Sequence, residues 1–396
     1  MIVGIVAEYN PFHNGHKLQI DYAKNNLKAN AIVVAMSGSF TQRGQIACFN
    51  KYVRSEAALK CGADIIFEIP TIFSTASARE FAAASVQLLA ASNIVDTILF
   101  GAESDNIELF KKSAKKLVEL ESNGVLDSSI NNGMSQGLSY ASARARALEE
   151  YLPKEIFSTP NNILGLEYCR YIYAKNINMD IAILKREGNN YNSTSLSGEI
   201  SSASAIRAAA ESTGKFHAIP DEALNIYSCN PFISADDVSL LLHYKLLLDD
   251  DYEKYMDCSA ELADRIRNNL DEYISFNQFC DLLKTKNIAY SRISRVLCHI
   301  LLGITEDDFN VAKANGYISY LRMLGFSETG RGLLSQIKSK NPIPLLSAPG
   351  SAISRFDILS SDIVRSIETS KSKAALKTEY TRQFNLKNIQ NQGITE

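Results

Sequence analysis

Short apolar runs alternate with amphipathic stretches along the first half of the chain. Five runs are apolar over nearly their whole length, as strands buried on both faces are: residues 2–9, 31–38, 64–70, 95–104 and 181–188. Apolar residues recur with helical spacing over residues 15–26, 51–63 and 78–92. Strands that alternate with helices in this way are joined by right-handed crossovers. The pattern predicts an α/β fold with a Rossmann-like, doubly wound parallel sheet.

The pattern changes after about residue 215. Residues 235–257, 259–286 and 290–304 have helical spacing with charged faces, and a mixed element is expected near residues 312–345. A chain of 396 residues is long for a single core. We therefore predict two domains, one over residues 1–215 and a mostly helical one over residues 216–396.

Composition narrows the function classes only slightly. Hydrophobic residues make up 46% of the chain, charged residues make up 21%, and the formal net charge is -3. No global basic charge indicates a nucleic-acid partner, although a local basic patch can still attract one. No run approaches the ~20 apolar residues of a membrane span, and Met1 is not followed by a basic segment with a cleavage site. The seven cysteines form no CxxC pair, which favours reduced thiols. We expect a cytoplasmic protein without a membrane association.

Two of the five histidines, His13 and His16, are three residues apart in the segment NPFHNGH. The segment follows the first predicted strand and opens the first predicted helix, and ligands of open α/β sheets bind at this edge. A helix N-terminus attracts phosphate, and Gly15 would let the backbone approach a ligand closely. The two rings are therefore candidate donors to phosphate oxygens. A helix-cap or core role is the alternative, whereas a zinc site lacks clustered His, Cys or acidic partners.

The segment EISSASAIRAAAE, residues 199–211, combines hydroxyl groups at a predicted helix start with an arginine one turn later. Ser202, Ser204 and Arg207 could form a phosphate clamp, because helix N-termini and guanidinium groups both bind phosphate oxygens. By itself, the same segment is typical of an N-capped surface helix. Its value lies in its combination with the histidine pair at the other end of the same predicted domain.

These two segments resemble the signatures of the nucleotidylyltransferase superfamily, HxGH and an Ile-Ser-Ser-Thr-like segment that ends in Arg. The segments AEYNPFHNGH, MSGSFTQRG, GADIIFEIP, LFGAES, PNNILGLEY and ISSASAIR occur in this order, and together they resemble the bacterial tRNA(Met) cytidine acetate ligase family. The resemblance is dense over the first domain and loose over the second, through YSRISRVLCHILLGI. Ser204 stands where the family usually has Thr, and it keeps the hydroxyl.

The resemblance implies a nucleotidylyltransferase-type fold and an ATP-dependent ligase. Acetate would attack the α-phosphorus of ATP, and pyrophosphate would leave. The resulting acetyl-adenylate would acetylate N4 of the wobble cytidine, C34, of elongator tRNA(Met), with release of AMP. No nucleophilic Cys or Ser is required. Mg²⁺ is expected to be held by the ATP phosphates and water, with no metal site on the protein.

The resemblance also implies roles for individual residues. The catalytic groups would be His13, His16 and Arg207. Gly101 could equally be a strand-exit turn and Asn162 a helix cap. The expected ATP-binding residues are Ala7, Glu8, Tyr9, Asn10, Pro11, Phe12, His13, Asn14, Gly15, His16, Lys17, Leu18, Gln19, Ile20, Gly101, Asn162, Arg186, Ser202 and Ser204.

Binding of tRNA(Met) is expected from Arg43 and Lys51 near the mouth of the active site, and from Arg292 and Arg295 in the helical half. A wobble base has to leave the anticodon stack to be modified, and lysine and arginine hold the phosphate backbone. Solvated helix faces are the alternative interpretation for Arg292 and Arg295.

Two other functions share parts of this pattern. A small-molecule adenylyltransferase also carries HxGH, but such enzymes are usually near the size of the first domain alone. A non-catalytic RNA-binding protein with a relic nucleotide site would not need intact HxGH and SSASAIR segments. Pyrophosphate release from ATP in the presence of acetate separates the three functions.

Overall fold

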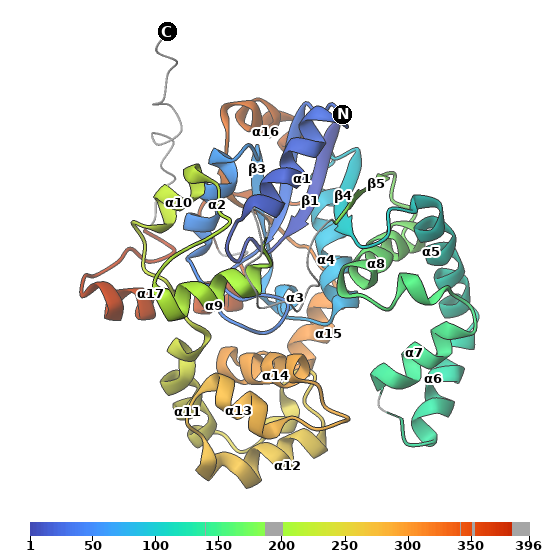
Figure 1. The fold of residues 1–396 in the computed structure, drawn as a ribbon, viewed down its shortest axis with the longest axis vertical. Coiled ribbons are helices and arrows are strands. Elements are labelled where there is room, and N and C mark those ends of the chain that lie inside the picture. The colour runs from blue at the N-terminus through green and yellow to red at the C-terminus, as the bar shows by residue number, and fades with distance from the viewer. Residues whose placement is uncertain (139, 187–200, 341, 351–352, 382–396) are drawn as a thin grey trace.

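The centre of the molecule is a seven-stranded sheet with the strand order β5-β4-β1-β2-β3-β6-β7 (Figure 1). The computed structural model describes residues 1–138, 140–186, 201–340, 342–350 and 353–381. Within these residues, the strands are β1 Ile2–Ala7, β2 Ala31–Ser37, β3 Ile65–Ile69, β4 Thr97–Ala102, β5 Asp180–Lys185, β6 Leu321–Phe326 and β7 Leu345–Leu346.

The first five strands pair in parallel and confirm the predicted α/β fold. The first four lie inside the apolar runs that predicted them, and β5 begins one residue before its run. The chain places β2 and β3 on one side of β1 and then places β4 and β5 on the other side. The reversal creates a switch point between the carboxyl ends of β1 and β4, where ligands of such sheets bind.

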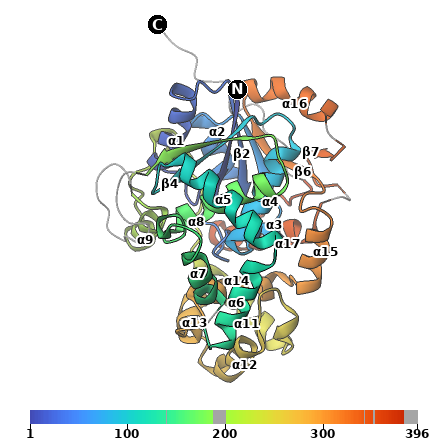
Figure 2. The ribbon, with the colours of Figure 1, turned by 90° about the vertical axis from the view of Figure 1, so that its right-hand side faces the viewer.

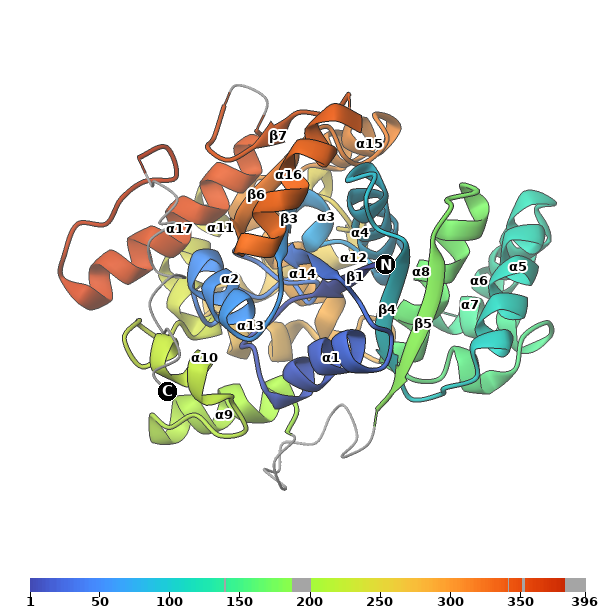
Figure 3. The same cartoon turned by 90° about the horizontal axis from the view of Figure 1, so that it is seen from above.

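Helices cover both faces of the sheet, which explains why the central strands are apolar on both sides. Along β2, Val33 and Ala35 pack with helix α4 (Ala78–Ala91) in one part of the core. The alternate residues Ile32, Val34 and Met36 pack on the other face with α1 (Asn14–Asn25) and α2 (Lys51–Lys60). Figure 3 shows α1 and α2 on the opposite side of the sheet from α4.

The remaining described helices are arranged around this core. They are α3 Thr71–Ser74, α5 Ile107–Ser122, α6 Val125–Ser135, α7 Tyr140–Glu149, α8 Pro160–Ala174, α9 Ala203–Thr213, α10 Asp221–Tyr227, α11 Ser239–Leu248, α12 Ala260–Asn269, α13 Phe276–Leu283, α14 Tyr290–Leu302, α15 Glu306–Ala314, α16 Glu328–Lys340 and α17 Arg355–Ser372. Short 3₁₀ turns span Lys154–Ile156, Ala235–Val238, Tyr252–Lys254 and Leu270–Glu272.

The C-terminal half is mostly helical, and α11 to α14 gather at one end of the molecule in two perpendicular views (Figures 1 and 2). The mixed element expected near residues 312–345 contains β6 and α16. Strand β6 pairs antiparallel with β3, with Ile65 opposite Phe326, and β7 extends the same sheet. A boundary at residue 215 therefore separates strand-rich from helix-rich sequence, but the sheet takes strands from both sides of it.

The helical end of the molecule packs against the loop that follows β2. Gly44 in this loop has φ +72°, and a Cβ atom on it would lie 2.5 Å from the Cα atom of Arg295 in α14. Only glycine combines this backbone conformation with so close an approach. The contact places α14 beside the carboxyl edge of the sheet, so the switch point lies between the sheet and the helical end.

Candidate active site

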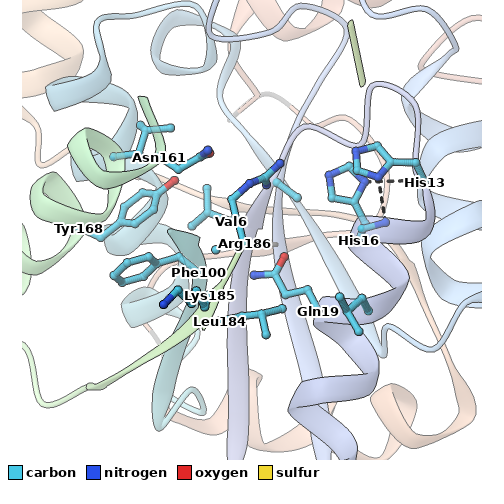
Figure 4. A pocket seen from close by; sticks show the side chains of 15 residues that line it. Val6, His13, His16, Gln19, Phe100, Asn161, Tyr168, Leu184, Lys185 and Arg186 are labelled. Atoms are coloured by element: carbon cyan, nitrogen blue, oxygen red, sulfur yellow. Dashed lines mark hydrogen bonds between the residues drawn. The ribbon is translucent and has the colours of Figure 1, made fainter. Parts of the chain in front are cut away.

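A cavity lies at the switch point of the sheet, beside the carboxyl ends of β1 and β4. Figure 4 shows His13 and His16 on one wall, Asn161 and Tyr168 on the opposite wall, and Arg186 between them. The apolar part of the lining comes from β4, β5 and α8, and it includes Phe100, Leu164, Tyr168 and Leu184. The cavity therefore combines an apolar wall with cationic and imidazole groups.

The two histidines hold one another at the start of α1. His13 is the N-cap residue, and its Nδ1 accepts a hydrogen bond from the backbone N–H of Gly15 at 3.1 Å. The Nδ1 of His16 accepts one from the backbone N–H of His13 at 3.2 Å. The rings stack with their centroids 3.8 Å apart and an interplanar angle of 26°. The pair is thus both a helix cap and part of the cavity wall.

This pattern of hydrogen bonds sets the tautomer of both rings. Because each Nδ1 accepts a backbone proton, each neutral ring carries its own proton on Nε2. Burial lowers the pKa of His13 to about 3, and the positive charges of Arg186 and Arg207 act in the same direction. Burial also lowers the pKa of His16 well below its usual value, with contributions from His13 and Arg186. Without a ligand, both rings are neutral Nε2–H donors at neutral pH.

The backbone N–H groups of the first turn of α1 already have partners, contrary to the expectation that they would bind phosphate. The N–H of Asn14 donates to the Ala218 carbonyl at 2.9 Å, and that of His16 donates to the His13 carbonyl at 2.8 Å. With Gly15 bonded to His13, phosphate recognition here depends on side chains and on the helix dipole.

Two arginines approach the histidines from β5 and α9. The backbone N–H of Arg186 bonds to the Ala102 carbonyl at 2.8 Å, which continues the pairing of β4 and β5. Its side chain passes over Gly101, where a Cβ atom would lie 3.4 Å from the Arg186 Cγ. The Arg207 guanidinium donates to the Asn10 carbonyl at 2.6 Å and to the Ser204 hydroxyl at 3.3 Å. The structure therefore brings the NPFHNGH segment and the start of α9 together, as predicted.

A second cavity adjoins the first and shares His13, His16 and Arg186 with it. Its additional walls are the loop over residues 41–45 and the start of α9. The predicted ATP-binding residues that line one cavity or the other are Ala7, Glu8, Tyr9, Asn10, His13, Gly15, His16, Leu18, Gln19, Gly101, Arg186, Ser202 and Ser204.

The other predicted ATP-binding residues are not among the described residues that line either cavity: Pro11, Phe12, Asn14, Lys17, Ile20 and Asn162. Phe12 and Ile20 are fully buried in the core, because the apolar side of this segment anchors it to the sheet. Lys17 forms an ion pair with Asp21 one turn later in α1. The start of α9 also has a capping role, because the Ser202 hydroxyl accepts from the Ala205 N–H at 3.1 Å.

Asn162 serves the helix start rather than the cavity. Its Oδ1 accepts from the backbone N–H groups of Glu103 and Ser104 at 2.9 and 3.2 Å, and its Nδ2 donates to the Glu155 carbonyl at 2.8 Å. The Glu103 carboxylate in turn accepts from the Asn162 backbone N–H at 3.1 Å. Both ends of the Asn162 amide thus bond to the protein, whereas the neighbouring Asn161, whose Nδ2 donates to the Glu103 carboxylate at 2.6 Å, lines both cavities.

The residues predicted to bind tRNA lie in three different environments. Arg43 lines the second cavity, as expected for a residue at the active-site mouth. Lys51 does not face the mouth, because it is only 1% exposed and forms ion pairs with Glu68 and Glu379 at 2.8 and 2.9 Å.

Arg292 and Arg295 lie three residues apart in α14, and both form ion pairs with Asp257, at 3.3 and 3.0 Å. Their guanidinium groups therefore already serve to hold the loop before α12. Their side chains are 34% and 13% exposed, so Arg292 is the more accessible of the two.

Sequence reasoning missed Arg54, which organises the floor of the site. This fully buried side chain in α2 donates to the backbone carbonyls of Glu8, Ser37, Gly38 and Phe49. The carbonyls of Glu8, Ser37 and Gly38 lie at the ends of β1 and β2, so one guanidinium holds both strand exits. An arginine in an amphipathic helix carries no sequence signal of such a role. Sequence reasoning also did not assign the cavity-lining residues Asn161, Leu164 and Tyr168. These three do lie in PNNILGLEY, one of the segments on which the family resemblance is based.

Among the described residues, no three His, Cys, Asp or Glu side chains come together to hold a metal ion. None of the helices that the structure describes has the length and apolar character needed to cross a membrane.

Known proteins resemble this chain over most of its length. A family model described as HIGH Nucleotidyl Transferase matches residues 1–385. The chain is 31% identical over 382 residues to the tRNA(Met) cytidine acetate ligase of Clostridium perfringens (strain ATCC 13124), covering 91% of this chain and 94% of that protein. It is 35% identical over 359 residues to the enzyme of that name from Clostridium novyi (strain NT), covering 87% and 89%.

Solved structures of Thermotoga maritima TmcAL share the fold. The apo form has a TM-score of 0.84 and 26% sequence identity, covering 96% of this chain and 95% of that chain. A crystal structure of the same protein bound with alpha-thio ATP has a TM-score of 0.82 and 26% identity, covering 96% of each chain.

Proposed function

The chain belongs to the tRNA(Met) cytidine acetate ligase family of HIGH nucleotidyl transferases, and from this membership we propose its reaction. The protein is a ligase that joins acetate to N4 of the wobble cytidine, C34, of elongator tRNA(Met). It consumes ATP through an acetyl-adenylate and releases AMP and pyrophosphate. Because the proposed substrate is a tRNA, we propose a cytoplasmic location.

The observation that carries this proposal is the convergence of the histidine pair with Arg186 and Arg207 at the switch point. Two neutral Nε2–H donors and two guanidinium groups line adjoining cavities, and the relative bound with alpha-thio ATP has the same fold. The neutral Nε2–H groups donate hydrogen bonds to phosphate oxygens, and the two guanidinium groups supply the positive charge. The site is therefore suited to a triphosphate.

In the first step, the nucleoside would occupy the first cavity, against Phe100, Leu184 and Gly101. The α-phosphate would lie between the histidine pair and the arginines. An acetate oxygen attacks the α-phosphorus, the bond to the β-phosphate bridging oxygen breaks, and pyrophosphate leaves. Donors that strengthen as charge develops on the phosphoryl oxygens lower this barrier, and positioning of the two anions supplies the remainder.

Mg²⁺ is proposed to arrive on the phosphates of ATP. The protein offers no cage for it among the described residues, since a single carboxylate, Glu8, lines the two cavities. Mg²⁺ usually keeps several waters and binds through substrate phosphates. When bound, it would neutralise phosphate charge, and no step of the mechanism is assigned to a protein-held ion.

In the second step, the cytidine would enter the second cavity, whose rim carries Arg43. Its N4 amine attacks the acetyl carbonyl, and AMP leaves. The loop over residues 41–45 and the start of α9 line this cavity, and the entering cytidine would shield the adenylate from water. Arg43 and Arg292 are the proposed contacts to tRNA phosphates.

The two alternative functions are less well supported. The relatives match over 94% and 89% of their own lengths, so the resemblance includes the helical half that a small adenylyltransferase lacks. The arrangement of His13, His16 and Arg207 in one site is unnecessary for a protein that only binds RNA.

Transfer of radiolabelled acetate to total tRNA in the presence of ATP tests the proposal. Wild-type protein should label the cytidine of tRNA(Met), and His16→Ala should lose the label while keeping its melting temperature. Absence of label with retained tRNA binding would overturn the ligase function. Acetate-independent release of pyrophosphate with another co-substrate would indicate the adenylyltransferase.

A further inference from the structure

Glu8 is chemically out of place in a site built for anions. Among the described residues that line the two cavities, it carries the one carboxylate, whereas Arg43, Lys185, Arg186 and Arg207 are cationic. It lines the second cavity and not the first. A negative charge opposes the binding of ATP and acetate. We therefore expect Glu8 to contact a ligand other than these two anions.

The carboxylate is held in a fixed position. The Oε1 of Glu8 accepts a hydrogen bond from the backbone N–H of Gln42 at 2.8 Å, and the Glu8 backbone carbonyl accepts one from the Arg54 guanidinium. Oε2 has no partner among the described residues. The Gln42 side chain donates to the Ala76 carbonyl at 3.1 Å, so the loop that holds Glu8 is itself anchored. One carboxylate oxygen is therefore pinned, and the other is left for a ligand.

The transfer step needs a group that can accept a proton. The cytidine N4 amine carries two protons, and one must leave as the new amide forms. His13 and His16 cannot accept it, because each Nδ1 is occupied by a backbone N–H and each Nε2 already carries a proton. Burial raises the pKa of Tyr9 above its usual value, which keeps its phenol neutral. The remaining charged groups of the lining are cations.

We propose that Glu8 is the catalytic residue that binds the exocyclic amine of the cytidine and takes its proton during acetyl transfer. This assignment rests on the proposed ligase function and deepens it. A bond forms between N4 and the acetyl carbon while the bond from that carbon to the AMP oxygen breaks. One N4 proton passes to Glu8 and then to water, and AMP leaves with the electron pair of the broken bond.

The chemistry of the base fits this assignment. Carboxylates recognise cytosine by accepting a hydrogen bond from N4, so Glu8 would favour a cytosine over a uracil, whose carbonyl at the same position is an acceptor. The same hydrogen bond places the carboxylate on the proton that has to leave. Recognition of the base and proton transfer would thus use one oxygen, Oε2.

The two half-reactions can be measured separately in Glu8→Gln. The first is acetate-dependent exchange of labelled pyrophosphate into ATP, and the second is acetyl transfer to a tRNA(Met) transcript with C34. The ratio of transfer to exchange should fall roughly 100-fold or more, as expected for loss of a general base. Gln retains an oxygen for the Gln42 N–H, so the fold should be kept.

Hydroxylamine provides the second measurement, because it is a strong nucleophile that intercepts acetyl-adenylate without a base from the protein. Formation of acetohydroxamate by Glu8→Gln, at the rate set by its exchange activity, would show an intact adenylate site. Asp105→Asn is the matched control. It removes a carboxylate 3.2 Å from Lys185 that does not line either cavity, and it should leave the ratio unchanged.

Each outcome decides the proposal. Equal losses of exchange and transfer in Glu8→Gln would assign Glu8 to the adenylation step, for example through Mg²⁺, and would overturn it. An unchanged ratio would overturn it as well. If wild-type protein shows neither exchange nor transfer, the proposed ligase function fails, and the role of Glu8 falls with it.

Discussion

His16 stacks on His13 with ring centroids 3.8 Å apart, and the Nδ1 of His16 accepts a hydrogen bond from the backbone N–H of His13. Each ring therefore supports the position of the other. Tyr9 and Phe12 surround His16, with centroid distances of 4.8 and 5.6 Å. The donors are held in place before any ligand arrives, which is the condition for electrostatic catalysis without reorganisation.

Removal of one histidine should therefore disable both. His13→Asn and His16→Asn should each lower acetate-dependent pyrophosphate exchange by roughly 10²–10³-fold, as does removal of one preorganised donor elsewhere. The double variant should lose little more, because residues that act as a unit are not additive. The measurement is initial exchange rates at saturating ATP. Multiplication of the two single effects in the double variant would contradict the mutual support.

The buried His13 should also make the stability of the ligand-free protein depend on pH. Its pKa in the folded state is about 3, below the ordinary value of 6.5. Below pH 6.5 the unfolded chain binds a proton that the folded chain does not. The free energy of unfolding therefore decreases as the pH is lowered, by up to about 1.4 kcal/mol per pH unit. This loss continues until the pH approaches 3.

Urea unfolding of wild type and His13→Asn between pH 7.5 and 4.5 measures this contribution. Asn is also a good N-cap residue but does not titrate. Wild type should therefore lose stability relative to the variant as the pH falls through 6.5. Parallel pH profiles for the two proteins would contradict the buried, neutral state of His13.

Local patterns in the sequence predicted the sheet and the core of the site because their causes are local. Apolar runs between amphipathic helices define buried parallel strands, and a histidine pair at a helix start needs only its own segment. Arg54 and Lys51 could not be assigned in this way. Their helix looks like an ordinary amphipathic segment, and their roles come from carbonyls and carboxylates that the fold brings to them.

Strand β6 likewise depends on a long-range contact that the local sequence pattern does not show. Its second residue is Arg322, a charged residue that argues against a buried strand. In the fold, Arg322 is 1% exposed and forms an ion pair with Glu379 at 3.1 Å. The partner lies 57 residues further along the chain, so the pattern around residue 322 contains no sign of it. A long-range ion pair allows this strand to join the sheet beside β3.

Arg54 should be essential for both stability and activity. Arg54→Met fills a similar volume but leaves the carbonyls of Glu8, Ser37 and Gly38 without their donor. Each buried polar group left unsatisfied costs about 1–3 kcal/mol, so unfolding in urea should show a loss of at least 3 kcal/mol. Arg331→Met, which removes an exposed ion pair with Glu328, should cost less than about 1 kcal/mol. Similar losses in the two variants would contradict the role of Arg54 at the strand exits.

Lys51 and Arg43 should separate stability from tRNA binding. Lys51→Met leaves Glu68 buried beside an apolar side chain and should destabilise the fold by about 3–5 kcal/mol. The double change with Glu68→Leu should recover part of that loss, since it removes the carboxylate left unpaired, while Glu379 keeps Arg322 as its partner. Arg43→Ala should instead weaken tRNA binding and reduce its salt dependence by about one ion. Filter binding at several salt concentrations tests this, and a reduced salt slope in Lys51→Met would contradict its buried position.

Asn161 and Asn162 are neighbours in the sequence but should fail in different assays. Asn162→Ala leaves the backbone N–H groups of Glu103 and Ser104 without an acceptor. It should lower the free energy of unfolding by about 2 kcal/mol or more and should change the KM for ATP little in the folded protein. Asn161→Ala removes a polar group from the cavity wall and should raise that KM roughly tenfold, the equivalent of one hydrogen bond. Steady-state kinetics with urea unfolding of the same preparations separates the two effects. A tenfold KM change in Asn162→Ala with unaltered stability would place its amide on the nucleotide instead of on the loop that follows β4.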